Sequence, residues 1–295
     1  MSEISAVSPL PSDIGRLGRL RTNIKPDTKI MEIGGSYNPV APRSAGYNTF
    51  TVDHASQDEL IEKYKALFED PQIEPVDFIC HDGVLSGSVG EEHHHTFDLC
   101  IASHVIEHMT NPVTFLQNAE KMLTPNGIFT MAVPDKRGCF DFFRALTGTG
   151  DWLAAYERKA SLHTGLARFD FEAYTVGHNG IIQWAPGDLR QFSFASKGLY
   201  EAYRIMKEVG DATTGEYYDI HAWTFVPSSF ALIIYELHAL GLTKFVPQNI
   251  HTSGMIEFMV DLVKVDQAPI TDEGRMTLLK RAALEQAEGF NQISG

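Results

Sequence analysis

Residues 97–133 read FDLCIASHVIEHMTNPVTFLQNAEKMLTPNGIFTMAV and carry the clearest structural pattern in the chain. The two apolar ends, Phe97–Ala102 and Gly127–Val133, predict buried strands. The segment between them predicts a helix that lies on a sheet, because apolar residues recur on one helical face: Phe115, Leu116, Ala119, Met122 and Leu123 within Pro112–Leu123. Strand, helix and strand in this order predict two parallel strands joined by a right-handed crossover.

The same alternation continues toward both ends of the chain. Upstream, the pattern predicts three strands and a helix: Lys29–Ile33, Thr49–Val52, Val76–Cys80 and the helix Gln57–Phe68. Downstream, it predicts an antiparallel hairpin at one sheet edge and two helices: strands Lys244–Ile250 and Met255–Val265, helices Ser228–Leu240 and Glu273–Glu288. The sequence therefore predicts an α/β fold with a Rossmann-like, doubly wound and mostly parallel sheet of seven strands.

This pattern divides the chain into four segments: an N-terminal arm at 1–26, a ligand-binding core at 27–137, an insertion at 138–225, and a stretch at 226–295 that completes the core sheet. The insertion holds 17 of the 31 aromatic residues, including all three tryptophans. Two interpretations stay open. The rings pack a small core of their own, or they form a lid that recognises a sugar, a planar substrate or a cation.

Composition restricts the partners. The formal net charge is −14, and no run of Lys or Arg forms a basic patch, which argues against nucleic acids and anionic membranes. No apolar run reaches the roughly 20 residues that cross a bilayer, and the first residues lack a signal-peptide pattern, so we expect a cytoplasmic protein. Cys80, Cys100 and Cys139 form no CxxC pair, which predicts no disulfide framework. We expect Cys80 and Cys100 to be core thiols.

A glycine-containing turn follows the first strand, at the carboxyl edge where doubly wound sheets bind ligands. A dinucleotide fingerprint starting at Gly34 is broken, because Ser36 and Pro39 stand where it needs glycine. Acidic residues accompany the ends of three successive strands: Glu32, Asp53 and Asp82. They suit an ammonium group, ribose hydroxyls and an adenine amino group respectively. The set therefore predicts a nucleoside that carries an amino acid and a positive charge.

With these features the sequence resembles the class I S-adenosylmethionine-dependent methyltransferases. The stretch Phe97–His108 looks like the fourth strand and "LEH" segment of that family. Leu123–Gly127 is similar to its "L-x-P-G-G" turn, and Val133–Asp135 to the end of its fifth strand. The resemblance covers residues 26–135 and, more loosely, 226–265. It implies S-adenosylmethionine as the cofactor, and a substrate-recognition role for the insertion.

The resemblance also assigns the cofactor residues. Glu32, Gly34 and Gly35 would line the methionine part, Asp53 the ribose, Asp82 and Gly83 the adenine, and Ser103 would lie near the sulfonium. Ser36 and His54 belong to the same turn and strand end and join this predicted cofactor site. The chain departs from the family's E/D-x-G-x-G-x-G motif at Ser36 and Asn38, and Asn126 replaces a glycine of the later turn.

Transfer to a hydroxyl or ammonium needs a base, and histidine is the first choice near neutral pH. We predict two catalytic histidines. His104 directly follows the fourth core strand, where it either caps the next turn or meets the acceptor. His221 ends the insertion, and Asp219 would orient its ring if the segment is extended. His108 has a structural or supporting role in this prediction, and His163 is a weaker candidate.

Four further residues are predicted to contact the substrate: Asp135, Arg137, His178 and Trp223. For Arg137, an ion pair with Asp135 or Asp141 is an equal alternative. The run Glu91–His95 reads EEHHH and predicts a solvated loop, since consecutive loop residues rarely point at one centre. No metal ion is expected from the sequence.

The observations together predict an S-adenosylmethionine-dependent methyltransferase that acts on oxygen of a small molecule or sugar. Two alternatives remain: an NAD-dependent oxidoreductase, which would share the sheet and Asp53, and a non-catalytic S-adenosylmethionine-binding module. The sequence leaves open the acceptor, the help of a metal, the role of the arm and the oligomeric state, for which it allows a homodimer.

Overall fold

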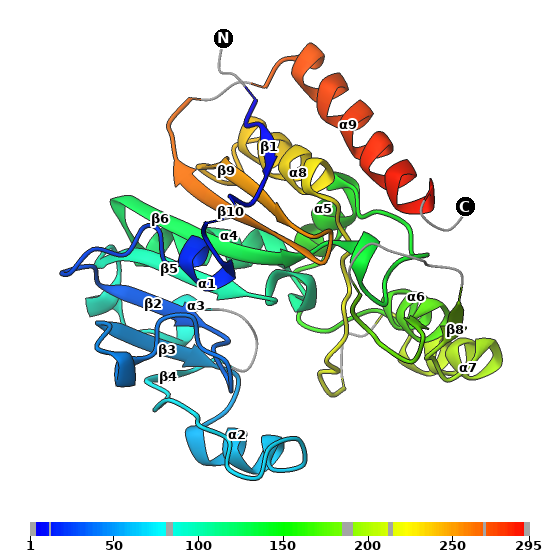
Figure 1. Cartoon of the computed structure of the whole chain (residues 1–295), viewed down its shortest axis with the longest axis horizontal. Helices are drawn as coiled ribbons and strands as arrows, with labels where there is room; N and C mark the ends of the chain where they lie inside the picture. The colour runs from blue at the N-terminus through cyan, green and yellow to red at the C-terminus, as the bar shows by residue number, and fades with distance from the viewer. Residues whose placement is uncertain are drawn as a thin grey trace.

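The computed structural model describes residues 4–11, 13–80, 85–184, 191–211, 215–267 and 270–291. Within these ranges the main sheet has eight strands, in the order β1-β9-β10-β6-β5-β2-β3-β4 (Figure 1). Their bounds are β1 (Val7–Pro9), β2 (Ile30–Ile33), β3 (Thr49–Asp53), β4 (Phe78–Ile79), β5 (Phe97–Ser103), β6 (Leu123–Pro134), β9 (Phe245–Ser253) and β10 (Glu257–Lys264).

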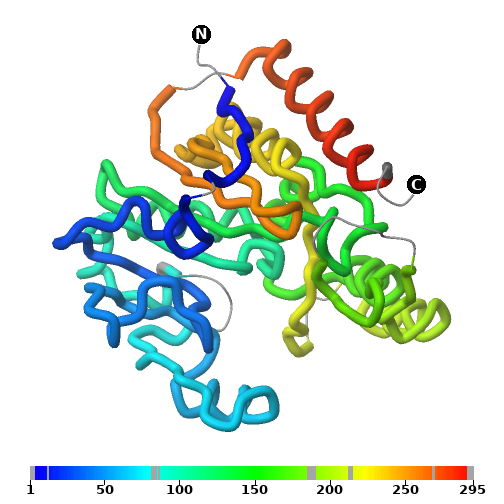
Figure 2. The backbone as a smooth tube through the Cα atoms, viewed as in Figure 1, coloured from blue at the N-terminus to red at the C-terminus, as the bar shows by residue number. Residues whose placement is uncertain are grey.

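The strand directions confirm the predicted doubly wound sheet. Strands β2 to β6 pair in parallel, and β10 lies antiparallel between β6 and β9. The prediction of seven strands was one short, because β1 from the N-terminal arm pairs in parallel with β9 and becomes the edge strand. Figure 2 shows this N-terminal segment running beside the orange segment that contains β9.

The helices are α1 (Arg16–Leu20), α2 (Gln57–Tyr64), α3 (Leu85–Ser88), α4 (Pro112–Met122), α5 (Thr149–Glu157), α6 (Gly165–Tyr174), α7 (Leu199–Val209), α8 (Pro227–Ala239) and α9 (Asp272–Asn291). Helix α4 begins where Asn111 accepts a hydrogen bond from the Thr114 amide at 3.1 Å, with Pro112 at its first position. The predicted apolar face of α4 is buried. Asn118 is also buried and donates to the Thr114 carbonyl at 2.6 Å.

The core lies on both faces of the sheet. In β5, Cys100 and Ala102 point into the main cluster under α4 and α8, whereas Leu99 and Ile101 point to the opposite face. Successive side chains of a strand point to opposite faces, so a strand covered on both sides reads as one continuous apolar run. This explains why the FDLCIA segment showed no alternation in the sequence.

The N-terminal arm closes the second face. Leu20 of α1 is fully buried in the cluster with Leu99, Ile101 and Met259. Arg19 is also buried and pairs with Asp261 of β10 at 2.8 Å. Residues 16–20 of the predicted N-terminal arm therefore belong to the folded core.

The insertion has two parts. Helix α5 joins the main core, where the fully buried Trp152 packs edge-to-face on Phe225 and Phe230. Helices α6 and α7 and the small antiparallel pair β7 (Val176–His178) and β8 (Phe192–Phe194) form a second group beside the sheet (Figure 1). There Phe142, Val176 and Trp184 pack with Phe192 in a separate cluster. The rings thus do build a small core, as the first interpretation expected.

Two further predictions can be checked on the described residues. All three cysteines are buried thiols, as expected for Cys80 and Cys100. In the described part of the chain, no helix is both long and apolar enough to span a membrane.

Candidate active site at the carboxyl edge

The turn after β2 depends on Gly34. Its φ is +69°, a conformation that side chains rarely adopt, and an added Cβ would lie 2.8 Å from Cγ2 of Val105. The Gly34 amide donates to the Val52 carbonyl at 2.8 Å, which holds the turn against β3. The turn is therefore pressed between β3 and the loop that follows β5.

Glu32 holds the far end of the same loop. Its buried carboxylate accepts hydrogen bonds from the backbone amides of Val40 and Ala41, the latter at 2.9 Å. Burial raises the pKa of Glu32, although these two amides oppose the shift. Glu32 was predicted to face an ammonium group of a ligand. The structure gives it backbone partners instead, so its observed task is to shape the loop from Gly35 to Ala41.

Asp53 ends β3 beside this turn and is almost fully buried. Its Oδ2 accepts from the amide and hydroxyl of Ser36 at 3.0 Å, and its Oδ1 accepts from the amide of His54 at 2.8 Å and lies 2.7 Å from Nδ1. Burial acts to raise the pKa of Asp53, but the bonds from His54 and Ser36 outweigh it and lower the pKa. Three of the predicted cofactor residues, Ser36, Asp53 and His54, therefore form one anionic cluster. The predicted adenine contacts Asp82 and Gly83 lie outside the described residues.

The end of β5 connects to the arm and to β10. His104 follows the strand with a φ of +56°, and its Nε2 lies 2.9 Å from Glu257. Arg16 of α1 donates to the other oxygen of Glu257 at 2.7 Å and to the hydroxyl of Ser103 at 2.7 Å. The pKa of Glu257 is lowered, because His104 and Arg16 outweigh the opposing effect of burial. Helix α1 of the arm therefore lies at the carboxyl edge of the sheet, where the cofactor site is predicted.

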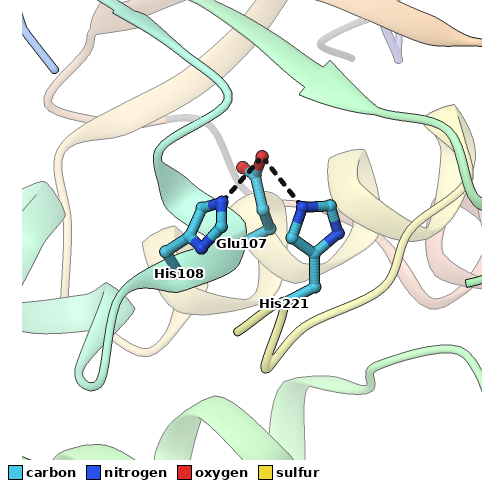
Figure 3. Close-up of side chains that lie close together, drawn as sticks. All are labelled: Glu107, His108 and His221. Carbon is cyan, nitrogen blue, oxygen red and sulfur yellow. Dashed lines mark ion pairs between the residues drawn. The ribbon is translucent and has the colours of Figure 1, made fainter. Parts of the chain in front are cut away.

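A buried carboxylate lies next to His104. Glu107, in the short helix η3 (Ile106–His108), is fully buried, and neither of its side-chain oxygens has a hydrogen-bond partner. Three imidazole nitrogens surround its Oε1: His104 Nδ1 at 3.7 Å, His108 Nε2 at 3.7 Å and His221 Nε2 at 3.8 Å. Figure 3 shows Glu107 between the rings of His108 and His221. The structure thus brings both predicted catalytic histidines to one carboxylate.

Carboxylates also fix the opposite side of these rings. Nδ1 of His221 lies 2.6 Å from buried Asp141, which also binds Arg144 at 2.6 Å. Nδ1 of His108 lies 2.8 Å from Asp219. Burial alone would raise the pKa of Asp141, yet His221 and Arg144 bring it down to about 2. The predicted pairing of Asp219 with His221 was wrong, because the chain turns so that Asp219 meets His108.

Two predicted substrate residues form a buried ion pair instead. Asp135 has no exposed surface, and its Oδ2 lies 2.6 Å from Arg137. Arg137 lies in η4 (Lys136–Gly138) and also contacts Glu288 of α9 at 3.0 Å. The predicted substrate contact is contradicted for this pair, since each partner already neutralises the other inside the protein. The alternative pairing of Arg137 with Asp135 is the one observed.

The other two predicted substrate residues have different positions. His178 is buried in β7 with its ring against Trp184 and Phe192, so the predicted substrate contact does not fit its place in the small core. Trp223 stays partly exposed and donates from Nε1 to the Met109 carbonyl at 2.6 Å. Its backbone amide and that of Ala222 donate to the Glu107 carbonyl. Trp223 therefore ties the insertion to η3.

The histidine run at 91–95 is only partly a solvated loop. Glu91 and Glu92 are exposed, as predicted. His93 instead packs its ring between Phe50, Phe78 and Phe97, in the short helix η2 (Glu91–His93). This contact anchors the run and turns one of its three rings away from solvent.

Asp141, Glu257 and Arg16 belong to the site, and the sequence did not single them out. Asp141 lies six positions after Asp135 and so just beyond the carboxyl end of β6. Its position at this edge is the one sequence signal that could have raised it as a partner for His221. Glu257 lies 153 positions after its partner His104, and Arg16 lies in the arm, 87 positions before its partner Ser103. No local sequence pattern indicates either pairing.

Part of the chain matches a known family model. Residues 34–131 match the family model described as "Methyltransferase domain". No curated protein matches the chain. Among solved structures, a SAM-dependent methyltransferase from Aquifex aeolicus is 10% identical with a TM-score of 0.37, over 81% of this chain and 82% of that one. A methyltransferase from Methanosarcina mazei is 12% identical with a TM-score of 0.41, over 88% and 100%.

A further similar structure is titled a putative Zn-dependent alcohol dehydrogenase from Rhodobacter sphaeroides, at 12% identity and a TM-score of 0.45, over 86% of this chain and 93% of that one. Structural similarity at these levels carries no argument about activity. The family model matches the part of the chain that runs from the Gly34 turn through Asp53, β5, η3 and α4 into β6. Residues 34–131, about a third of the chain, therefore form a methyltransferase domain, and the chain is an enzyme.

Proposed function

We propose that the chain is an S-adenosylmethionine-dependent methyltransferase that methylates an oxygen of a small molecule or sugar. One observation supports this above the others. The carboxyl edge of the sheet holds an anionic cluster around Asp53 and, one loop away, a histidine oriented by a carboxylate, His104 with Glu257. The first suits a nucleoside, and the second suits proton transfer from an acceptor.

The residues of the edge fit this cofactor. A Cβ at Gly34 would fill the space between this residue and Val105. Because Gly34 has no side chain, its backbone directly faces the loop after β5. Asp53 is an anion with a lowered pKa, and in this proposal ribose hydroxyls replace the hydrogen bonds that it now accepts from the Ser36 hydroxyl and the His54 ring. When bound, S-adenosylmethionine supplies a methyl group on a positively charged sulfur, which keeps the electron pair of the broken S–C bond.

His104 is the proposed proton acceptor. Donation from Nε2 to Glu257 leaves Nδ1 with its lone pair, and the side chain is 28% exposed, so an acceptor can reach it. The proton of the acceptor hydroxyl moves to Nδ1 as the O–CH₃ bond forms. Its neighbour Glu257 stabilises the resulting imidazolium, because a carboxylate beside a histidine favours the charged ring.

The acceptor enters from the side of the insertion. His221 lies on that side, with its ring held by Asp141. Tyr217, which donates to the His108 carbonyl at 3.3 Å, and Trp223 hold the last part of the insertion over η3. The net charge of −14 disfavours nucleic-acid acceptors, and this is why the proposal names a small molecule or sugar.

The test is methyl transfer from radiolabelled S-adenosylmethionine to a panel of sugars, polyols and phenols. With an acceptor found, His104→Gln is expected to lower kcat by about 10²–10⁴-fold, the usual contribution of a general base, without weakening donor binding. His95→Gln is the matched control, because His95 is exposed and lies before β5.

Two outcomes would contradict the proposal. Donor binding without turnover on any acceptor would favour a non-catalytic binding module. Unchanged kcat in His104→Gln, with turnover present, would refute the role of this histidine.

A further inference from the structure

Glu107 is an unusual carboxylate. It is fully buried, neither oxygen accepts a hydrogen bond, and no Lys or Arg pairs with it among the described residues. Burying a carboxylate without a partner costs several kcal/mol, so native proteins pair such a group, protonate it or give it to a metal ion. The groups that do face Glu107 are imidazole nitrogens at 3.7–3.8 Å, beyond hydrogen-bond distance.

The outer partners of the rings decide which atoms face inward. Asp219 at Nδ1 of His108 and Asp141 at Nδ1 of His221 each favour the tautomer with the proton on Nδ1. Nε2 of each ring then presents a lone pair toward Oε1 of Glu107. Electron pairs from two imidazoles and a carboxylate thus converge on one buried point, an arrangement that a bound cation would stabilise.

We infer that Glu107, His108 and His221 bind one divalent transition-metal ion. Their ligand atoms all lie within 4.8 Å of one another. Two ligand atoms that each lie 2.0–2.1 Å from a tetrahedral Zn²⁺ are about 3.4 Å from each other. In the structure, Nε2 of His108 and Nε2 of His221 lie 3.7 and 3.8 Å from Oε1 of Glu107, so small movements of the rings would bring these distances to the required value. His104 faces the same oxygen at 3.7 Å but lies outside this set, so it stays available as the base.

The surroundings have the form of a metal site. Histidines that bind metals nearly always give their other ring nitrogen to a carboxylate or carbonyl, and a carboxylate lies beside Nδ1 of both rings, Asp219 at 2.8 Å from His108 and Asp141 at 2.6 Å from His221. Asp141 is in turn fixed by Arg144 at 2.6 Å. Imidazole nitrogen favours Zn²⁺ and its transition-metal neighbours over Mg²⁺ and Ca²⁺, which take oxygen ligands.

The ion would have one further use. With three protein ligands, a tetrahedral ion keeps a position for an oxygen of the acceptor and lowers the pKa of that hydroxyl. This use rests on the proposed methyl transfer. Metal binding itself does not, so it is measured without donor or acceptor.

The experiment is a titration of chelator-treated protein with Zn²⁺ in competition with a chromophoric chelator. One equivalent is expected to bind. Glu107→Gln should weaken it by at least about 100-fold, since loss of an outer partner alone costs 10–100-fold. Asp141→Asn should weaken Zn²⁺ binding by about 10–100-fold, because Asp141 is such an outer partner. His95→Gln is the matched control, because His95 is the exposed histidine of the run, and it should leave the affinity for Zn²⁺ unchanged.

Stability separates a ligand from a structural residue. Glu107→Gln removes an uncompensated charge, so the metal-free variant should be at least as stable as the metal-free parent in denaturant unfolding. Co²⁺ spectra of the parent should show nitrogen and oxygen ligation without thiolate bands. The inference is overturned if the parent binds no equivalent of Zn²⁺, if Glu107→Gln binds it equally well, or if the histidine-run control abolishes binding.

Discussion

Gly34 illustrates how one residue shapes the turn after β2, where the cofactor is proposed to bind. Its φ of +69° and its contact with Val105 make alanine unfavourable for two reasons, strain and overlap. Gly34→Ala should lose about 1–2 kcal/mol of unfolding free energy from the left-handed backbone, and at least about 10-fold in donor affinity as the turn moves away from Val105. Chemical denaturation and calorimetric titration with S-adenosylhomocysteine measure the two effects.

Gly46→Ala is the matched control for Gly34. Gly46 has a φ of +89°, yet an added Cβ would meet nothing within 4 Å. It should lose only the stability that the left-handed backbone costs, and it should keep normal donor affinity. Equal affinities in the two variants would show that the Gly34 turn does not position the cofactor.

The free energy of unfolding should depend on pH through the side chain of Lys136. It is 2% exposed, and burial lowers its pKa from 10.5 to about 8. Between these values the unfolded chain binds more protons at this side chain than the folded chain does, so stability rises with pH. The side chain should contribute a gain of about 2 kcal/mol between pH 7 and pH 9.5.

Lys136→Met isolates that contribution. The variant should be more stable than the parent at pH 7, because a charge no longer has to be buried, and the gap should narrow as the pH rises to 9.5. Urea unfolding at a series of pH values measures the gap. A gap that stays constant across this range would mean that Lys136 keeps an ordinary pKa in the folded protein.

Residue partners were the least predictable part of the site. The guess that Asp219 orients His221 used only local alternation, whereas the observed partner, Asp141, lies 80 positions earlier in the chain. Glu32 was placed correctly at the turn, but its partners Val40 and Ala41 follow from how the loop folds back. Pairings of this kind depend on tertiary packing, and a single sequence carries no record of it.

Elements were predicted better than partners. The strands β2, β3, β5 and β6 and the helix α4 appear where periodicity placed them, since buried strands and amphipathic helices leave strong local patterns. The arm and the insertion were harder. Trp152 joins the main core and Leu20 the cluster on the second face of the sheet, both from segments without a clear period, because a single apolar residue can complete a core that other elements build.

Trp152 provides a test of how the insertion is attached. Because it is fully buried against Phe225 and Phe230, Trp152→Ala should cost about 3–5 kcal/mol of unfolding free energy. Tyr200→Ala, at a side chain 90% exposed on α7, should change it by less than about 0.5 kcal/mol. Denaturant unfolding measures both. Equal, small effects would mean that α5 is not part of the core.

At the scale of the whole molecule, the topology explains why the site forms where it does. Parallel strands β2, β3, β5 and β6 end at one edge, and the loops that follow them carry Gly34, Asp53, His104 and Asp141. The arm, which precedes these strands in the chain, and the insertion, which follows β6, then reach this edge through Arg16 and His221. The sheet and its edge could be predicted from the sequence. The contributions of the two outer segments could not, because nothing local indicates which edge they cover.

The most direct measurement is calorimetric titration of the protein with S-adenosylmethionine, S-adenosylhomocysteine and NAD, repeated with Asp53→Asn and with Asp58→Asn as an exposed control on α2. We predict micromolar binding of both adenosyl ligands, loss of at least about 10-fold in Asp53→Asn because the ribose loses an anionic acceptor, and unchanged binding in Asp58→Asn. Binding of NAD in place of the adenosyl ligands would contradict the methyltransferase account.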